Sequence, residues 1–197
     1  MKKTRLIVFS IAFAAFTFMS QALYSQGNFN VDVENSNLNW KGYKPTGTHN
    51  GIITLASGDI VLKDNKITGG NFVTDMSTIK DADGSAKLEG HLKSEDFFEI
   101  AVFPISKFEI TETENKGEKI QVTGNMTIKG ISKQITFPAT LIVNEDALVL
   151  TSDTFQINRA DFNVKFKSKS FFNDLKDKFL NDEFDFQVTI MAKKYQL

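Results

Sequence analysis

The sequence predicts an all-β fold with a small helical insertion, in which about eight antiparallel strands form a barrel. Between Lys119 and Val143, apolar and polar residues alternate on both sides of a turn at Lys129-Gly130, and alternation with a period of two is typical of a strand with one apolar face. The pattern recurs between short turns along most of the chain and ends in a strong strand pattern at 184–192. Such a series of hairpins forms a sandwich or a barrel, and a last strand that can pair with the first favours the barrel.

The first 25 residues are expected to be a secretory signal peptide. Lys2, Lys3 and Arg5 precede an uncharged apolar run at 6–19, and small residues follow it, which is the usual layout of such a signal. We expect cleavage after Ala22 or Ser25, export of a single domain at 26–197, and a periplasmic or secreted location. A retained anchor is the alternative, but a run of about 14 residues is short for a membrane span.

The charge and composition exclude some classes of partner. The signal carries three of the 23 basic residues and none of the 24 acidic ones, so 26–197 has 20 bases and a net charge of −4. A mildly acidic domain is not expected to bind nucleic acid. The chain has no Cys, and its 19 Phe far outnumber one Trp and three Tyr. Because Phe has no polar atom that needs a partner, this bias indicates a large, dry interior.

The first part of the domain is predicted to form strands separated by recognisable turns. Turn signals occur at Pro45-Thr46-Gly47, at Ser57-Gly58 and at Asp64-Asn65, where these residue types favour reversal of the chain. The predicted strands are a long first strand at 29–42 with a kink at Asn35-Ser36, a second at 48–56, a short one around 60–62 and a fourth at 67–76.

A helical insertion is predicted between Lys80 and Glu99. Leu88 and Leu92 are four residues apart, which is helical spacing, and Ser94 followed by two acids is a helix-start pattern. We expect a helix near 84–92 and a short helical turn near 95–98.

The second part of the domain returns to alternation. Its predicted elements are a strand at 105–111, a solvated turn at 112–118, the hairpin at 119–143, a turn at 144–146, a strand at 148–157, further alternation at Phe162, Val164 and Phe166, an irregular segment at 171–182 and the last strand.

Five segments of the chain, in order, resemble the YceI-like family of polyisoprenoid-binding, lipocalin-like bacterial proteins. They are WKGYKPTGTHNGIITL at 40–55, GGNFVTDMSTI at 69–79, HLKSEDFFEIAVFP at 91–104, GNMTIKGISKQITFP at 124–138 and INRADFNV at 157–164. The resemblance implies an extended lipocalin-like antiparallel barrel that holds a long amphiphile, such as a polyprenyl phosphate or an isoprenoid quinone, and requires no other cofactor. The chain departs from the family at Asn158, where an Asp usually precedes the matched Arg159, and this weakens the case for a salt bridge at that position.

The alternating apolar faces and the insertion supply the expected lining of the interior. Aromatic clusters are more often core than binding site, but in a ligand-binding barrel the core is the pocket. The flexible Met side chains suit an isoprenoid tail, and Leu88 and Leu92 could form a lid. The expected lining residues are Trp40, Ile53, Phe72, Met76, Leu88, Leu92, Phe97, Phe103, Phe108, Met126, Ile128, Phe137, Phe155 and Phe186.

Three polar residues, His49, His91 and Arg159, are candidates for contact with a ligand head group. Each has a structural alternative: either histidine can hydrogen-bond the backbone, and Arg159 can pair with Asp75 or Asp96 instead of a ligand phosphate. Two His without Cys do not suggest a metal site. No Ser-His-Asp pattern indicates a catalytic centre.

The leading hypothesis is a non-enzymatic binding or carrier protein for an isoprenoid lipid or quinone, with transient membrane contact. The oligomeric state is left open, a dimer included. One alternative is an enzyme acting on a lipidic or quinone substrate, with His49, His91 and Arg159 beside the apolar pocket. Another is a stress-response scaffold barrel that binds no ligand because its own Phe side chains plug the bore.

Overall fold

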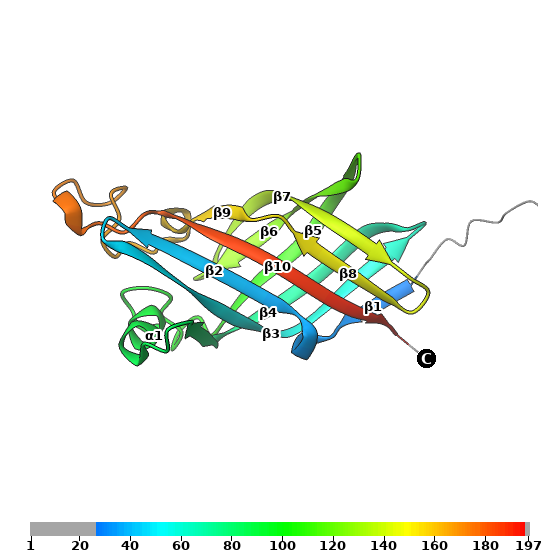
Figure 1. Cartoon of the computed structure of the whole chain (residues 1–197), viewed down its shortest axis with the longest axis horizontal. Helices are drawn as coiled ribbons and strands as arrows, with labels where there is room; N and C mark the ends of the chain where they lie inside the picture. The colour runs from blue at the N-terminus through cyan, green and yellow to red at the C-terminus, as the bar shows by residue number, and fades with distance from the viewer. Residues whose placement is uncertain (1–26, 196–197) are drawn as a thin grey trace, which may run out of the picture.

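The computed structural model describes residues 27–195, which form an antiparallel barrel with one short α-helix (Figure 1). The predicted signal peptide lies outside the described residues. The strands are β1 (Gly27–Val31), β2 (Asn37–Lys44), β3 (Gly47–Lys63), β4 (Lys66–Asp81), β5 (Ile105–Lys116), β6 (Lys119–Ile128), β7 (Ile131–Val143), β8 (Ala147–Ser152), β9 (Phe155–Asn158) and β10 (Glu183–Lys194). The helices are α1 (Ala86–Lys93) and the 3₁₀ turns η1 (Val33–Asn35), η2 (Arg159–Phe162) and η3 (Lys176–Lys178).

Strand β10 closes the barrel, as the sequence predicted. It pairs with β1 and β2 on one side and with β8 and β9 on the other. Strands β1 and β2 both pair with β3 and β10, so they occupy one position in the ring. Strands β8 and β9 follow each other along the same side of β10 and share another position. The ten strands therefore fill eight positions, and the barrel is confirmed over the sandwich.

The two ends of the barrel differ in their connections. The antiparallel order places α1, the β2–β3 and β6–β7 turns and the 159–182 connection at one end, called here the helical end. The described chain termini and the turns β3–β4, β5–β6 and β7–β8 lie at the other, the terminal end (Figure 1). The cavity described below belongs to the helical end.

A β-bulge replaces the turn that was predicted at Ser57-Gly58. Strand β3 runs through this point, and its register with β4 shifts between Leu55 and Ser57. The buried residues change from odd to even numbers across the shift, from Ile53 and Leu55 to Ile60 and Leu62. A bulge adds one residue to one strand and so reverses its inward parity, which is why the sequence pattern looked like two strands.

Other differences from the predicted elements are local. The hairpin β5–β6 extends through most of the predicted solvated turn, the kink in the first strand is the turn η1, and the predicted strand at 148–157 divides into β8 and β9. The alternation at Phe162, Val164 and Phe166 does not form a strand, because Phe162 ends the turn η2 and Asn163 is left-handed with φ 60°. The helical insertion is confirmed, with Ser85 capping α1 by accepting a hydrogen bond from the backbone N–H of Leu88 at 3.3 Å.

The interior is filled by side chains toward the terminal end. Phe29, Ile60, Val122 and Leu148 are at most 1% exposed and belong to one apolar cluster. Within residues 27–195, no helix has the length and apolar character required to cross a bilayer.

Candidate ligand cavity

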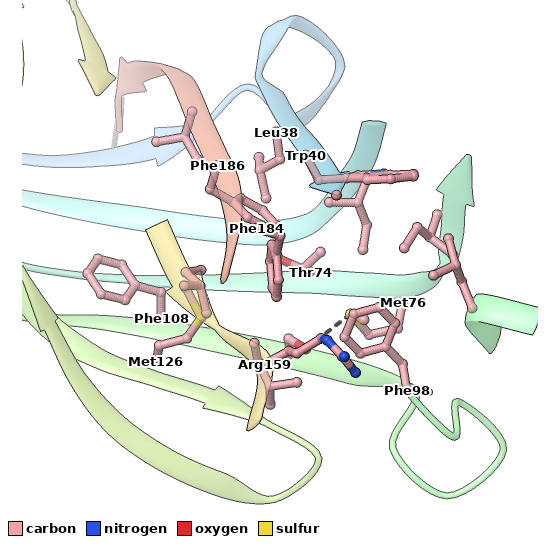
Figure 2. Close-up of a pocket in the computed structure, with 18 of the residues that line it drawn as sticks. Leu38, Trp40, Thr74, Met76, Phe98, Phe108, Met126, Arg159, Phe184 and Phe186 are labelled. Atoms are coloured by element: carbon pink, nitrogen blue, oxygen red, sulfur yellow. Dashed lines mark hydrogen bonds between the residues drawn. The ribbon is translucent and has the colours of Figure 1, made fainter. Parts of the chain in front are cut away.

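A cavity of about 200 Å³ occupies the half of the barrel toward the helical end. Its wall is almost wholly apolar and receives side chains from the strands, from α1 and from the 159–182 connection. Half-exposed Tyr43, Lys44 and His49 line it where the strands β2 and β3 meet their turn, and we call this region the mouth. Figure 2 shows lining residues such as Leu38, Met126 and Phe184 converging on one space from different strands.

Six phenylalanine rings form a continuous belt along the cavity wall. Neighbouring ring centres are 4.3 to 6.3 Å apart along the belt, and the closest pair, Phe137 and Phe155, is stacked at an interplanar angle of 10°. In order around the wall, the belt consists of Phe72, Phe108, Phe137, Phe155, Phe186 and Phe184. Rings at such distances stabilise one another by more than the burial of their apolar area alone. Contacts between neighbouring rings can therefore stabilise the wall even though the cavity beside it is empty of side chains.

Gly124 on β6 lets the belt cross that strand. A Cβ at this position would lie 2.5 Å from the Phe108 ring and 2.4 Å from the carbonyl oxygen of Glu109. The ring of Phe108 on β5 therefore occupies the volume that a side chain of β6 would otherwise fill. Gly51 makes room for Trp40 in the same way, because a Cβ at Gly51 would lie 2.8 Å from the indole ring and 1.8 Å from the Lys80 carbonyl oxygen.

The structure places nearly all the sequence-predicted site residues around this cavity. Those that line it are Trp40, Ile53, Phe72, Met76, Leu88, Leu92, Phe97, Phe108, Met126, Ile128, Phe137, Phe155, Phe186, His49, His91 and Arg159. Phe103 is the exception: it is half-buried in the segment after α1 and lies against Gly130 in the β6–β7 turn, where a Cβ would be 3.3 Å from its ring. Whether these residues contact a ligand stays a prediction.

Several lining residues were not identified from the sequence. Phe184 has the parity of Phe186 and Val188, so the alternation of the last strand contained the signal for it. Phe98 and Leu180 come from irregular segments, where no periodicity indicates which side chains face inward.

A group of rings joins α1 to the 159–182 connection above the cavity. The His91 ring lies edge-on to Phe97 and Phe166, with ring centres 5.4 and 4.4 Å away. Its Nε2 lies 3.4 Å from Oδ2 of Asp96, so a carboxylate and not the expected backbone group is its polar partner. Leu88 and Leu92 of α1 also line the cavity, so α1 covers part of it; its role as a lid stays a prediction.

Arg159 ties the two ends of the 159–182 connection together and pairs with neither Asp75 nor Asp96, which corrects the sequence prediction. Its guanidinium donates four hydrogen bonds of 2.9 to 3.1 Å to backbone carbonyls, and Nη2 forms an ion pair of 3.1 Å with Oδ1 of Asp182. The four carbonyl groups belong to Val164, Phe166, Leu180 and Asn181. Each guanidinium nitrogen thus has a protein partner, and Arg159 is better suited to hold the connection than to bind a head group.

The partner carboxylate of Arg159 is stabilised in its charged form. Burial opposes the charge of Asp182, but hydrogen bonds from Ser168 and Ser170 and the charge of Arg159 outweigh it and hold the pKa of Asp182 below its usual value. Ser170 donates from its hydroxyl group at 2.7 Å. Burial lowers the pKa of Arg159, and the charges of Asp182 and Glu183 oppose this.

His49, Asp81 and Asp83 place their candidate ligand atoms within 4.8 Å of one another, close enough to be considered as a metal site. However, Nζ of Lys44 lies 3.2 Å from Nε2 of His49. An ammonium group can only donate, so Nε2 accepts and the ring proton lies on Nδ1, which faces Oδ1 of Asp81 at 3.6 Å. A protonated nitrogen does not bind a metal, and the nearby positive charge disfavours a cation, so these groups fit a polar contact between β3 and β4 better.

Residues 29–192 match the model of the YceI-like domain. A UPF0312 protein of Enterobacter sp. (strain 638) is 39% identical over 61 residues, which are 31% of this chain and 32% of that protein. Protein YceI of Salmonella arizonae is 32% identical over 84 residues, 43% of this chain and 41% of the relative. The matched segments thus span less than half the length of these curated relatives.

Two solved structures have a similar fold. The crystal structure of Burkholderia cenocepacia BcnA has a TM-score of 0.68 at 19% sequence identity, covering 82% of this chain and 98% of that one. The structure of a polyisoprenoid binding domain from Saccharophagus degradans, implicated in plant cell wall breakdown, has a TM-score of 0.66 at 14% identity, covering 87% and 100%. At these identities the likeness establishes the barrel architecture.

Proposed function

The chain belongs to the YceI-like family, and we propose that it is a binding or carrier protein for a long isoprenoid amphiphile. The observation that carries the proposal is the apolar cavity, which extends from the polar mouth into the barrel between α1 and the phenylalanine belt. The polyisoprenoid binding domain from Saccharophagus degradans, which shares the barrel, is consistent with it. The cavity also argues against a scaffold barrel whose bore is fully plugged.

The cavity suits the beginning of an apolar tail. A dry cavity of about 150 Å³ holds a benzene molecule, so by scale one of about 200 Å³ has room for the first one or two isoprene units. Each buried methylene contributes about 0.8 kcal/mol. Further units require lining side chains to move, and the thioethers of Met76 and Met126 adapt readily to such changes.

The polar mouth suits the head of the ligand. Lys44 and His49 line the cavity there and contact each other at 3.2 Å. A lysine ammonium is a compact positive charge that binds phosphate well, whereas a quinone offers only neutral carbonyl acceptors. The ligand proposed is a polyprenyl phosphate or an isoprenoid quinone. A substitution at Lys44 should separate the two, because only the phosphate depends on its positive charge.

Mass spectrometry of lipids extracted from the purified protein, followed by titration of the stripped protein, tests the proposal. We expect a co-purified prenyl compound, and an affinity for polyprenyl phosphate or isoprenoid quinone well above that for a straight-chain fatty acid. Lys44→Gln should weaken binding of the phosphate but hardly affect the quinone, whereas Lys63→Gln at the terminal end should change neither. Protein that is always empty and takes up no prenyl compound would contradict the proposal.

We also propose that the protein acts outside the cytoplasm, in the periplasm or after secretion. The support is the charge and hydropathy pattern of residues 1–25. Cell fractionation, with sequencing of the N-terminus of the mature protein, tests it: an intact Met1 on cytoplasmic protein would exclude export.

A further inference from the structure

The connection between β9 and β10 exposes two adjacent aromatic rings at the helical end. Phe171 and Phe172 are 41% and 48% exposed, whereas the other Phe residues within 27–195 are buried or half-buried. The same connection contributes Leu180 and Asn181 to the cavity lining and projects beyond the strands at the helical end (Figure 1). Exposed aromatic rings on a connection whose base lines an apolar cavity indicate an interaction surface.

Lysines surround this aromatic pair. Residues 165–179, called here the docking loop, contain five Lys and two Asp, a net charge of +3, although 26–197 as a whole carries −4. The ammonium group of Lys165 lies 5.3 Å from the centre of the Phe171 ring, and that of Lys169 lies 3.4 Å from the centre of the Phe179 ring. All five lysines are exposed: Lys165, Lys167, Lys169, Lys176 and Lys178.

The docking loop is held at both of its ends. Arg159 bonds the carbonyls of Val164 and Phe166 at one end and of Leu180 at the other. Because the base of the loop is ordered before any partner arrives, less conformational entropy is lost when the tip binds.

We propose that the docking loop binds the surface of an anionic phospholipid membrane. Phe171 and Phe172 enter the boundary between head groups and acyl chains, and the lysines beside them contact lipid phosphates. Aromatic residues combined with basic ones are typical of segments that lie in this interface, and a lysine near an anionic surface contributes roughly a fivefold gain in affinity. Positive charge next to exposed rings favours such a membrane over an uncharged one.

This inference rests on the proposed function only for the biological benefit of membrane binding, and not for the binding itself. A carrier whose ligand resides in membranes should take it up faster if the cavity mouth is held against the bilayer, because the apolar tail of the ligand then enters the barrel with less exposure to water. The binding of the loop itself requires no ligand, so it can be measured on empty protein.

Flotation of the full domain with vesicles tests the inference. Wild-type protein should float with vesicles of phosphatidylcholine mixed with phosphatidylglycerol, but not with phosphatidylcholine alone, and high salt should weaken the binding. The double variant Phe171→Ser/Phe172→Ser should bind at least about tenfold more weakly. Lys165→Glu/Lys169→Glu should bind about 25-fold more weakly or worse, since two contributions of roughly fivefold are lost.

Matched controls lie on other parts of the barrel. Ile142→Ser removes a side chain of β7 that is 64% exposed, and Lys63→Glu/Lys66→Glu reverses two charges beside the β3–β4 turn at the terminal end. Both controls should bind vesicles like the wild type. The Tm of every variant should stay near that of the wild type, because all the changed side chains are exposed. If one variant is destabilised, the effect of salt on vesicle binding by the wild type still tests the role of the lysines.

The inference would be overturned by wild-type protein that does not bind anionic vesicles, or by controls that lose as much binding as the docking-loop variants. A wild-type dimer that is absent in Phe171→Ser/Phe172→Ser would assign the surface to a second copy of the chain and overturn it as well. Failure of the proposed function appears separately, as loss of prenyl-ligand binding in titrations without vesicles. If the proposed function and the membrane inference are both correct, the docking-loop variants keep their ligand affinity but take up ligand from vesicles more slowly.

Discussion

In the half of the barrel near the terminal end, Phe29, Ile60 and Leu148 pack together and are at most 1% exposed. In the half near the helical end, strands of the same ring surround a cavity of about 200 Å³. Both halves are built from alternating apolar residues. The difference is that inward side chains fill the first half, whereas in the second the rings of the phenylalanine belt pack beside one another along the wall.

The comparison shows that alternation specifies an apolar interior but not whether it is full. In the hollow half, stability comes from ring-to-ring contacts and from polar connections across the helical end, above all those of Arg159. In the filled half it comes from burial of aliphatic and aromatic side chains. Substitutions should therefore separate the two halves: changes in the filled half affect stability alone, and changes in the hollow half affect ligand binding as well.

The largest effect is expected at Arg159, on which the hollow half depends. Arg159→Met leaves four backbone carbonyls without their donor and Asp182 without its positive partner. Removing one member of a buried charge pair costs about 3–5 kcal/mol, so the free energy of unfolding should fall by that amount and ligand affinity should fall with it. Denaturant titration measures the loss. The exposed Lys133→Met is the control, and a loss for Arg159→Met as small as for this control would refute the anchoring role.

A pair of truncations compares the two halves directly. Leu148→Ala in the filled half should cost about 2–5 kcal/mol of stability, as buried Leu to Ala changes do, and leave the affinity of the folded protein for a prenyl ligand unchanged. Phe155→Ala in the belt should cost less stability, because this half-buried ring faces the cavity, but weaken ligand binding. Denaturant titration measures the loss of stability of each variant, and ligand titration measures its loss of affinity. If the two losses stand in the same ratio in both variants, the halves do not differ in the way described.

The sequence was sufficient to predict the barrel, and nearly all the residues predicted to line the cavity do line it, because inward parity follows directly from period-two alternation. It was not sufficient where backbone irregularity changes that parity. The bulge near Ser57 looked like a turn, and the 3₁₀ turn before Asn163 buried Phe162 and Val164 in a spacing like that of a strand.

Arg159 illustrates a different limit. Most of its partners are backbone carbonyls of an irregular connection, and carbonyl groups leave no trace in the residue types of a sequence. Gly124 illustrates the same limit, because its missing side chain makes room for the ring of Phe108 on the neighbouring strand. Such a contact joins two strands at a place that pattern analysis does not specify.

Gly124 offers a test of the belt itself. Gly124→Ala places a Cβ 2.5 Å from the Phe108 ring and 2.4 Å from a backbone oxygen of β5, so the ring must leave the wall and the strands must shift. Overpacking of this kind costs about 1–3 kcal/mol, and the displaced ring should also reduce ligand affinity. Gly69→Ala, where a Cβ meets nothing within 4 Å, is the control. Equal stability and affinity in the two variants would show that the belt does not require this glycine.

The smallest effect concerns the pH dependence of the Arg159–Asp182 pair. The pKa of Asp182 is lower in the folded protein than its usual value, so the folded state favours the charged carboxylate more than the unfolded state does. Its contribution is complete above the unfolded pKa of about 3.9 and decreases as the pH falls toward and through the lower folded value, where both states bind the proton. The difference in unfolding free energy between the wild type and Asp182→Asn should therefore be constant from neutral pH down to about pH 5 and shrink below about pH 4. Asp153→Asn, which removes a largely solvent-accessible carboxylate in the short junction between β8 and β9, is the control in the same denaturant titrations, and the profile should not depend on it. A difference that stays constant through the acidic range would mean that Arg159 holds the connection through the carbonyl groups alone.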